Sequence, residues 1–175
     1  MRAQSLLLAL AVLLALSTSV SAAHIRVEGH VKELQSLRNM KDAYVRLYKD
    51  GIKIKAHYTK KNGRFQFRLQ NNAIDVIRVS APGHITKCFQ IDTHGAAWVG
   101  DHSVSLLKVD MTMMEEVKGF DHSYFDMPLG LAKYNPTTGF LSWSKKYEAQ
   151  LTPELVQLME EYNDRVELYA ALIEP

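Results

Sequence analysis

The sequence has 175 residues, with 21 lysines and arginines, 19 aspartates and glutamates and a formal net charge of +2. A charge so close to zero gives no global field for binding nucleic acid, and the single cysteine, Cys88, excludes an internal disulfide. Without residues 1–23, about 150 residues remain, which is the usual size of one domain with its own hydrophobic core.

Residues 1–23 have the pattern of a signal peptide. Arg2 precedes an uninterrupted apolar run over 6–16, and small residues then offer cleavage after Ala22 or after Ala23. The run is too short to span a bilayer, and no later segment approaches the roughly 20 apolar residues that a membrane helix needs. We therefore expect an exported chain, periplasmic or secreted, with no transmembrane segment in its mature form.

The segment 43–69 contains two strong hairpin signals, Asp50-Gly51 and Asn62-Gly63, because both residues of a type I′ turn need a positive φ. The two hairpin registers agree and predict an antiparallel meander of three strands with one apolar face and one polar face. The register pairs Leu47 with Ile54 and Tyr58 with Phe67. The predicted apolar face consists of Ala43, Val45, Leu47, Ile52, Ile54, Ala56, Tyr58, Phe67 and Leu69.

The polar face of this meander is the main candidate binding surface. Like charges lie opposite each other across it, as with Arg46 and Lys55, which costs about a few tenths of a kcal/mol per pair unless an acid lies nearby. Two interpretations stay open: a solvated face partly neutralised by acids of the C-terminal helix, or a surface for an acidic glycan, a lipid headgroup or an acidic protein. The candidate residues are Tyr44, Arg46, Tyr48, Lys53, Lys55, His57 and Arg68.

Further strands are expected around the meander, since short apolar runs bounded by turn residues recur at 25–31, 74–80, 85–92 and 104–113. Cys88 lies in one of them, next to Phe89, and this favours an inert, half-buried thiol. About seven strands at short, regular spacing predict a β-sandwich.

The loop 93–103 carries an alternative ligand site formed by His94, Trp98 and His102. An exposed Trp98 indole would stack on a sugar ring, whereas the histidines with Asp101 would suit a metal ion. The other histidines are scattered without metal-binding spacing. A copper site at His24, after cleavage at Ala23, finds little support. We expect no bound metal and no cofactor.

From Glu115 the pattern changes to a linker, a small hairpin and a helix. The linker is expected to wrap the domain through Phe120, Tyr124 and Phe125, and the hairpin joins 131–134 to 140–143 across a Pro- and Gly-containing turn. The helix is predicted to begin at Thr152-Pro153-Glu154, where a hydroxyl cap, a proline and an acid coincide.

The apolar residues of this helix recur at steps of four and three, which predicts one apolar stripe. That stripe has two candidate destinations, the chain's own sandwich or another protein chain. Its members are Leu155, Met159, Tyr162, Val166, Tyr169 and Ile173.

Residues 25–92 resemble the carboxypeptidase regulatory-like domain, a transthyretin-like β-sandwich. The resemblance is carried by Gly29, Ala43, Thr59, the Gly-x-Phe-x-Phe run at 63–67 and the Ser-Ala-x-Gly turn at 80–83. The chain departs from the family at His84, where Tyr or Phe is usual. Residues 125–147 and the helix after them are similar to the C-terminal part of small exported proteins of Gram-negative bacteria that carry this domain first.

The resemblance implies a non-catalytic module for folding support, adhesion or assembly beside other envelope components, and it carries over no catalytic residue. The residues agree, because the chain has no Gly-x-Ser-x-Gly elbow and no nucleophile is marked beside Asp121, His122 and Asp126. We therefore predict a protein that is not an enzyme.

The predicted fold is a mainly β, seven-strand transthyretin-like sandwich over 24–114, followed by a linker, a β-hairpin and one amphipathic α-helix over 115–175. The predicted function is an exported binding or assembly module that acts through the polar-aromatic sheet face and the helix. Its partner would be an envelope protein or a glycan. The alternative is a carbohydrate-binding module that uses the Trp98 loop.

Overall fold

The computed structural model of the chain describes residues 25–95, 106–135, 137–138 and 140–173. The predicted signal peptide, Trp98, Asp101 and His102 lie outside these residues. Among the described residues, no helix combines the length and the apolar character needed to cross a bilayer.

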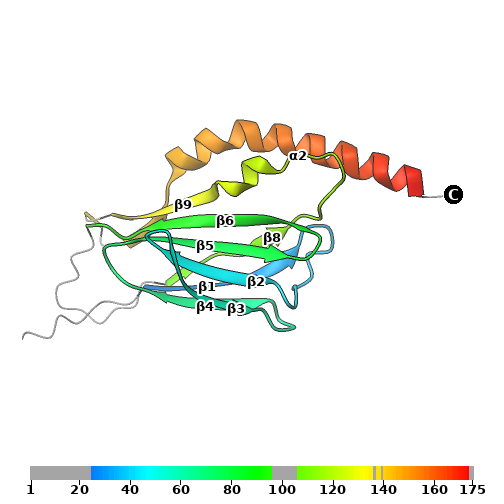
Figure 1. Cartoon of the computed structure of the whole chain (residues 1–175). Helices are drawn as coiled ribbons and strands as arrows, with labels where there is room; N and C mark the ends of the chain where they lie inside the picture. The colour runs from blue at the N-terminus through cyan, green and yellow to red at the C-terminus, as the bar shows by residue number, and fades with distance from the viewer. Residues whose placement is uncertain (1–24, 96–105, 136, 139, 174–175) are drawn as a thin grey trace, which may run out of the picture.

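Two β-sheets pack face to face (Figure 1). The smaller sheet has the order β4-β1-β7, and β8 pairs with the part of β1 that follows the segment paired with β7. Its strands are β4 (Arg64–Leu69), β1 (Ile25–Glu33), β7 (Leu106–Lys108) and β8 (Met111–Met113). The larger sheet has the order β10-β9-β6-β5-β2-β3. Its strands are β10 (Phe140–Trp143), β9 (Pro128–Asn135), β6 (His84–Asp92), β5 (Ile74–Ala81), β2 (Tyr44–Lys49) and β3 (Ile52–Tyr58). The prediction of a mainly β sandwich is confirmed.

The core lies between the two sheets because alternate residues of each strand point inward. In β4 the inward residues are Phe65, Phe67 and Leu69, each 1% exposed, and they face Val45 and Leu47 of β2. Full burial of one such side chain contributes about 1.5–3 kcal/mol. These inward positions of β2 and β4 agree with the predicted alternation.

The Asp50-Gly51 hairpin forms as predicted, with positive φ at both residues and Lys49 opposite Ile52. Beyond that pair, a β-bulge between Leu47 and Tyr48 shifts the register, so that Leu47 lies opposite Lys55 and Ile54 is the extra residue. Ile52 and Ile54 are 70% and 53% exposed. The predicted apolar face is therefore wrong for β3, including Ala56 and Tyr58, which are also exposed.

The second predicted hairpin does not form. After the Asn62-Gly63 turn the chain crosses to the other sheet, where β4 pairs with β1 and not with β3. Gly63 has φ +64, and a Cβ there would lie 2.5 Å from the Val31 carbonyl oxygen. A turn signal predicts that the chain reverses, but it does not determine which sheet the next strand joins. The three-strand meander is thus wrong.

The C-terminal hairpin of β9 and β10 forms as predicted, with Leu141 opposite Tyr134. It extends the larger sheet, because β9 pairs in parallel with β6 and places Ala132 opposite Ile91. This pairing starts β9 at Pro128, earlier than predicted. The hairpin therefore covers a sheet edge that would otherwise be open.

The helix α2 (Lys145–Ile173) begins before Thr152. The Ser144 hydroxyl accepts the Tyr147 backbone N–H at 3.2 Å, as a helix N-cap does. The Thr152 hydroxyl instead donates to the Glu148 carbonyl at 2.8 Å, and Pro153 lies inside the helix. The predicted start at Thr152 is wrong because Ser144 provides an earlier cap.

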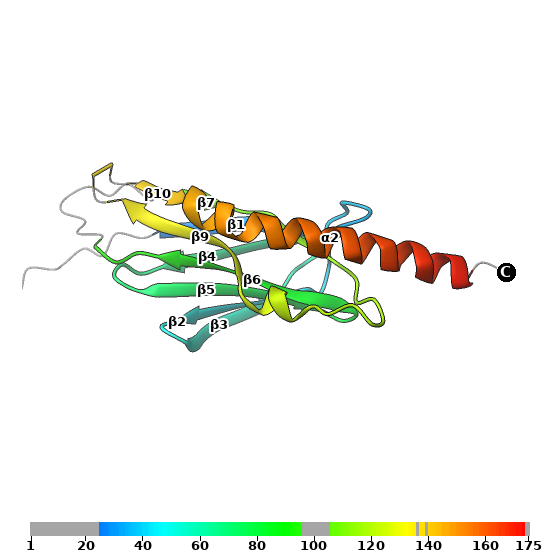
Figure 2. The same ribbon diagram turned by 90° about the horizontal axis from the view of Figure 1, so that it is seen from above.

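The apolar stripe of α2 packs on the chain's own sandwich for most of its length. A second apolar cluster forms there from Ile85, Met114, Phe120, Phe125 and Tyr162, with Leu155, Leu158, Met159 and Val166 against it. The last turns of α2 run past the strands (Figures 1 and 2), and Leu168, Tyr169 and Leu172 are 63%, 52% and 76% exposed. Packing within the chain is confirmed from Leu155 to Val166 and ends there.

Candidate functional site

Four residues of the predicted binding surface remain together on the outer face of the larger sheet. They are Tyr44, Arg46 and Tyr48 of β2 and Lys53, which lies opposite Tyr48. The Tyr58 ring stacks on the Tyr44 ring with centroids 4.7 Å apart, and the Arg46 guanidinium lies 5.3 Å from the Tyr44 ring centroid. This part of the surface is both aromatic and basic.

The other three predicted residues lie elsewhere. The bulge in the β2–β3 pair places Lys55 opposite the core residue Leu47, and it turns the His57 ring inward to 5.1 Å from the Phe67 ring. Burial, together with the charge of Lys55, lowers the pKa of His57. Arg68 lies on β4 of the smaller sheet, opposite Arg26. The expectation of one continuous face of seven residues is therefore wrong.

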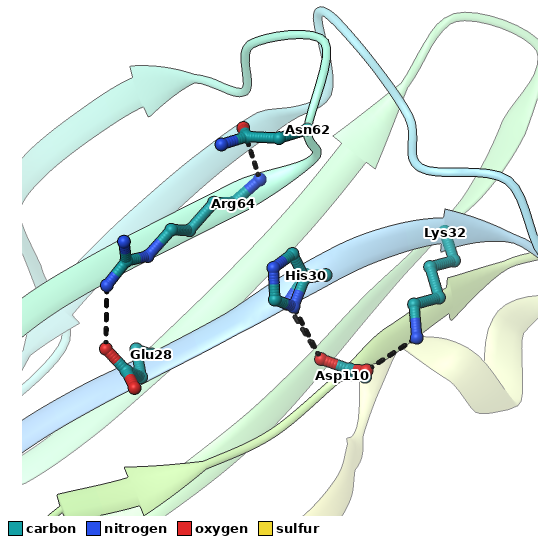
Figure 3. Close-up of polar contacts among 6 residues, drawn as sticks. All are labelled: Glu28, His30, Lys32, Asn62, Arg64 and Asp110. Carbon is teal, nitrogen blue, oxygen red and sulfur yellow. Dashed lines mark hydrogen bonds and ion pairs between the residues drawn. The ribbon is translucent and has the colours of Figure 1, made fainter.

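The outer face of the smaller sheet carries a polar network that the sequence did not indicate (Figure 3). Asp110 accepts the His30 backbone N–H at 2.9 Å and the Lys32 ammonium at 2.7 Å, and it lies 3.2 Å from His30 Nδ1. Arg64 pairs with Glu28 at 3.0 Å. Partial burial would raise the pKa of Asp110, but hydrogen bonds from Lys32 and His30 outweigh it and hold the pKa below its ordinary value.

Asp110 occupies the break between β7 and β8. A Cβ at Gly29 would lie 1.5 Å from the Val109 carbonyl oxygen, so glycine lets the backbone at Val109 approach β1. There the Asp110 carboxylate accepts the His30 N–H that a regular ladder would give to a carbonyl. Gly29 thus has a steric role in the strand pairing.

An open cleft of about 410 Å³ lies between the sheets, where β6, β9 and β10 face β7, β8 and the start of α2. The residues that give it chemical character are Lys87, Phe89, Asp110, Trp143 and Glu148. The volume falls in the range of small-molecule sites, which combine apolar walls with a few polar groups. We refer to it as the inter-sheet cleft.

Lys87 lies at the inner wall of the cleft and is only 7% exposed. Its ammonium group donates to the Thr112 carbonyl at 2.9 Å and lies 5.4 Å from the Phe125 ring centroid. Burial lowers the pKa of Lys87 to about 8. An ammonium group has three N–H donors, so Lys87 can also donate to a ligand in the cleft.

Trp143, on β10 of the same sheet as Lys87, gives the cleft an aromatic wall and is 37% exposed. Its indole lies over Gly130, where a Cβ would be 2.9 Å from the ring, and it meets the Phe89 ring edge-on at 5.9 Å. The sequence predicted the hairpin that carries Trp143 but not the face that this side chain takes, so Trp143 was missed as a site residue.

The other residues that the sequence singled out for ligand binding or chemistry do not lie together. His94 Nδ1 lies 2.8 Å from an Asp92 oxygen, while its predicted partners Trp98 and His102 lie outside the described residues. Asp126 pairs with Arg78 at 3.1 Å. The Cys88 side chain is fully buried and not half-buried as predicted, and this burial raises the pKa of its thiol. Among the described residues, one group of metal-binding side chains converges: Glu33, His84 and Glu115.

No family model matches the chain, and no curated protein matches it. Among solved structures, it is similar to the TIE protein of Bacillus anthracis at 11% identity and a TM-score of 0.43, covering 53% of this chain and 17% of that one. It is also similar to the catechol 1,2-dioxygenase of Pseudomonas arvilla C-1, at 12% identity and a TM-score of 0.43, covering 64% of this chain and 59% of that one.

The dioxygenase domain of a dioxygenase carbohydrate-binding protein fusion from Streptomyces sp. SirexAA-E is also similar, at 11% identity and a TM-score of 0.41, covering 58% of this chain and 86% of that one. The chain spans less than two thirds of the first solved structures it matches. Likenesses this low carry no functional information.

Proposed function

We propose that this chain is a non-catalytic, exported binding module that holds a glycan segment in the inter-sheet cleft. The observation that carries the proposal is the combination, in one open cleft, of the Trp143 indole with Lys87 and Glu148. A pyranose ring presents an apolar face that stacks on an aromatic ring and hydroxyl groups that both donate and accept hydrogen bonds.

The polar groups of the cleft include both a donor and an acceptor for the hydroxyl groups of a sugar. Lys87 can donate to sugar oxygens, whereas the carboxylate of Glu148 can accept from sugar hydroxyls. The hydrogen bond from Lys87 to the Thr112 carbonyl holds its ammonium group in place. A site whose polar groups are already held in position loses less entropy when it binds.

We also keep the proposal that the sandwich is of the carboxypeptidase regulatory-like, transthyretin-like type. Two of the glycines that carry the resemblance support it, because a Cβ would meet the Val109 oxygen at Gly29 and the Val31 oxygen at Gly63. Steric need at both positions explains why such a pattern would mark a fold and not a catalytic site.

The test is calorimetric titration of the chain with neutral oligosaccharides and with uronic-acid oligosaccharides. We expect saturable binding to at least one class, and Trp143→Ala should weaken it about tenfold or more, as the loss of an aromatic anchor does. Tyr58→Ala is the matched control, because Tyr58 is 63% exposed on the outer face of the larger sheet. The proposal fails if neither class binds, or if the two variants bind equally well.

A second candidate function, assembly with an envelope protein, is favoured by the end of α2. Leu168, Tyr169 and Leu172 are exposed where the helix leaves the sandwich. A photo-crosslinking residue at position 168 should give one dominant adduct in intact cells, and the same residue at the exposed position 160 should give none. Equal adducts at both positions would contradict a contact specific to the helix end.

A further inference from the structure

Three backbone segments meet at the end of the sandwich that lies beside Tyr162. The Leu34 N–H donates to the Met113 oxygen at 2.9 Å, which ties the end of β1 to β8. The Ile85 N–H donates to the Met114 oxygen at 2.8 Å, so the same segment also bonds the start of β6. Because backbone hydrogen bonds hold all three segments, the positions from which their side chains project are fixed relative to one another.

Each segment contributes one side chain to a common point. Glu33 ends β1, His84 begins β6, and Glu115 forms an antiparallel bridge with His84. One ligand atom from each, a histidine nitrogen and two carboxylate oxygens, lies within 4.8 Å of the other two. None of the three residues lines the inter-sheet cleft.

The hydrogen bond of the His84 ring determines which ring nitrogen is left without a partner. Its Nδ1 lies 2.8 Å from the Pro82 carbonyl oxygen, and a carbonyl only accepts, so Nδ1 carries the hydrogen. In the neutral form of the ring, Nε2 then has a free lone pair. This atom is buried and has no hydrogen-bond partner in the part of the chain that the structure describes.

In the neutral ring, the unpartnered Nε2 is the nitrogen available to a metal ion, and the two carboxylates of the cluster supply the negative charge that such an ion needs. Neutral imidazole with its other N–H bound to a carbonyl is also the usual state of a metal-binding histidine. The Ser36 hydroxyl donates to the Glu33 carboxylate, which gives that carboxylate the supporting contact typical of metal ligands.

We propose that Glu33, His84 and Glu115 form a binding site for a divalent first-row transition-metal ion, for which Zn²⁺ is the probe. The two carboxylates balance the charge of the ion, and the imidazole selects against Ca²⁺ and Mg²⁺, which prefer oxygen ligands. Glu115 is exposed, so the ion has a path from solvent. Three protein ligands leave coordination positions for water or for a ligand group.

The site would join the two sheets, since β1 belongs to the smaller sheet and β6 to the larger. Binding to the folded state alone stabilises it. We therefore expect saturating Zn²⁺ to raise Tm by about 5 °C or more.

The experiment titrates the purified, metal-free chain with Zn²⁺ by calorimetry and follows Tm in parallel. We expect one ion per chain, with Ca²⁺ and Mg²⁺ giving no comparable heat. His84→Ala should abolish this binding, and Glu115→Gln should weaken it about tenfold or more. His122→Ala is the matched control, because His122 is an exposed histidine outside the cluster.

Circular dichroism of each variant without metal separates loss of the site from loss of the fold. The proposal is overturned if the chain shows no saturable one-to-one binding, or if folded His84→Ala binds Zn²⁺ as tightly as the parent. Binding that His122→Ala reduces equally would show adventitious coordination by surface histidines and would also overturn it. Glycan binding at the cleft does not depend on any of these outcomes.

Discussion

At the scale of single residues, two features constrain which side chain a position can carry: a close approach of two backbones and a buried charge. Gly29 lets the Val109 carbonyl approach β1, and Lys87 places an ammonium group in the wall of the inter-sheet cleft. The first feature is steric and the second is electrostatic. Each therefore gives a different experimental signature.

Gly29→Ala should destabilise the protein by about 3 kcal/mol or more, because its Cβ would have to displace the Val109 backbone. Gly51→Ala is the control: it has φ +81 and open space around the new Cβ, so it should cost only about 1 kcal/mol. Urea unfolding measures both. Equal losses in the two variants would show that the clash at Gly29 relaxes freely.

Lys87→Met should stabilise the protein at pH 7 by about 2 kcal/mol, since it removes a buried charge. Burial lowers the pKa of Lys87 from 10.5 to about 8, so the unfolded chain binds more protons between these two values. The parent should therefore gain stability relative to Lys87→Met as the pH rises from about 8 to about 10.5.

Chemical unfolding of the parent and of Lys87→Met across this pH range provides the measurement. The difference between the two curves isolates Lys87, because the other titrating groups are common to both proteins. A difference that stays constant with pH would mean that Lys87 keeps its ordinary pKa in the folded state.

At the scale of elements, local signals predicted turns and alternation better than boundaries and partners. The Asp50-Gly51 turn formed, but a bulge beyond it turned Ile54 to solvent and His57 toward Phe67. The proline at 153 suggested a helix start, yet the helix continues through it from a cap at Ser144. In both cases a second feature, the bulge beyond the turn or the earlier cap at Ser144, overrode the local sequence signal.

Ser144→Ala should destabilise the protein by about 1 kcal/mol because it removes the cap of α2. Thr152→Ala should change stability by no more than about 0.5 kcal/mol, since its hydroxyl bonds back to the Glu148 carbonyl inside the helix. Thermal or urea unfolding compares the two. A larger loss for Thr152→Ala would instead place the helix start where the sequence pattern predicted it.

At the scale of the whole molecule, α2 closes the end of the sandwich through the second apolar cluster. Tyr162 is 1% exposed, its ring meets the Phe120 ring at 5.4 Å, and its hydroxyl accepts from Gln35 at 3.2 Å. One side chain of the helix thus contacts both the linker and the turn after β1. The exposed helix end beyond it has no such role in the described structure.

Tyr162→Ala should cost about 3 kcal/mol or more, as the removal of a large buried aromatic side chain does. Tyr169→Ala removes the same side chain from a site that is 52% exposed and should change stability by about 0.5 kcal/mol or less. Denaturant unfolding of both variants tests this. Similar losses would mean that the helix end also packs on the fold.

The sequence by itself determined the β-rich character, the Asp50-Gly51 turn, the C-terminal hairpin, and the inward alternation of residues such as Leu47 and Phe67. These features depend on short-range causes, namely backbone sterics at turns and the period of two in strands. They are therefore readable from neighbouring residues.

Only the tertiary structure decided that β4 leaves β3 and joins β1, that Trp143 and Lys87 share a cleft, and that Glu33, His84 and Glu115 converge. Strand partners are chosen by how much apolar surface the complete set of strands buries, and that sum involves residues far apart in the chain. The same long-range sum sets which polar side chains meet, so neither candidate site has a local sequence motif.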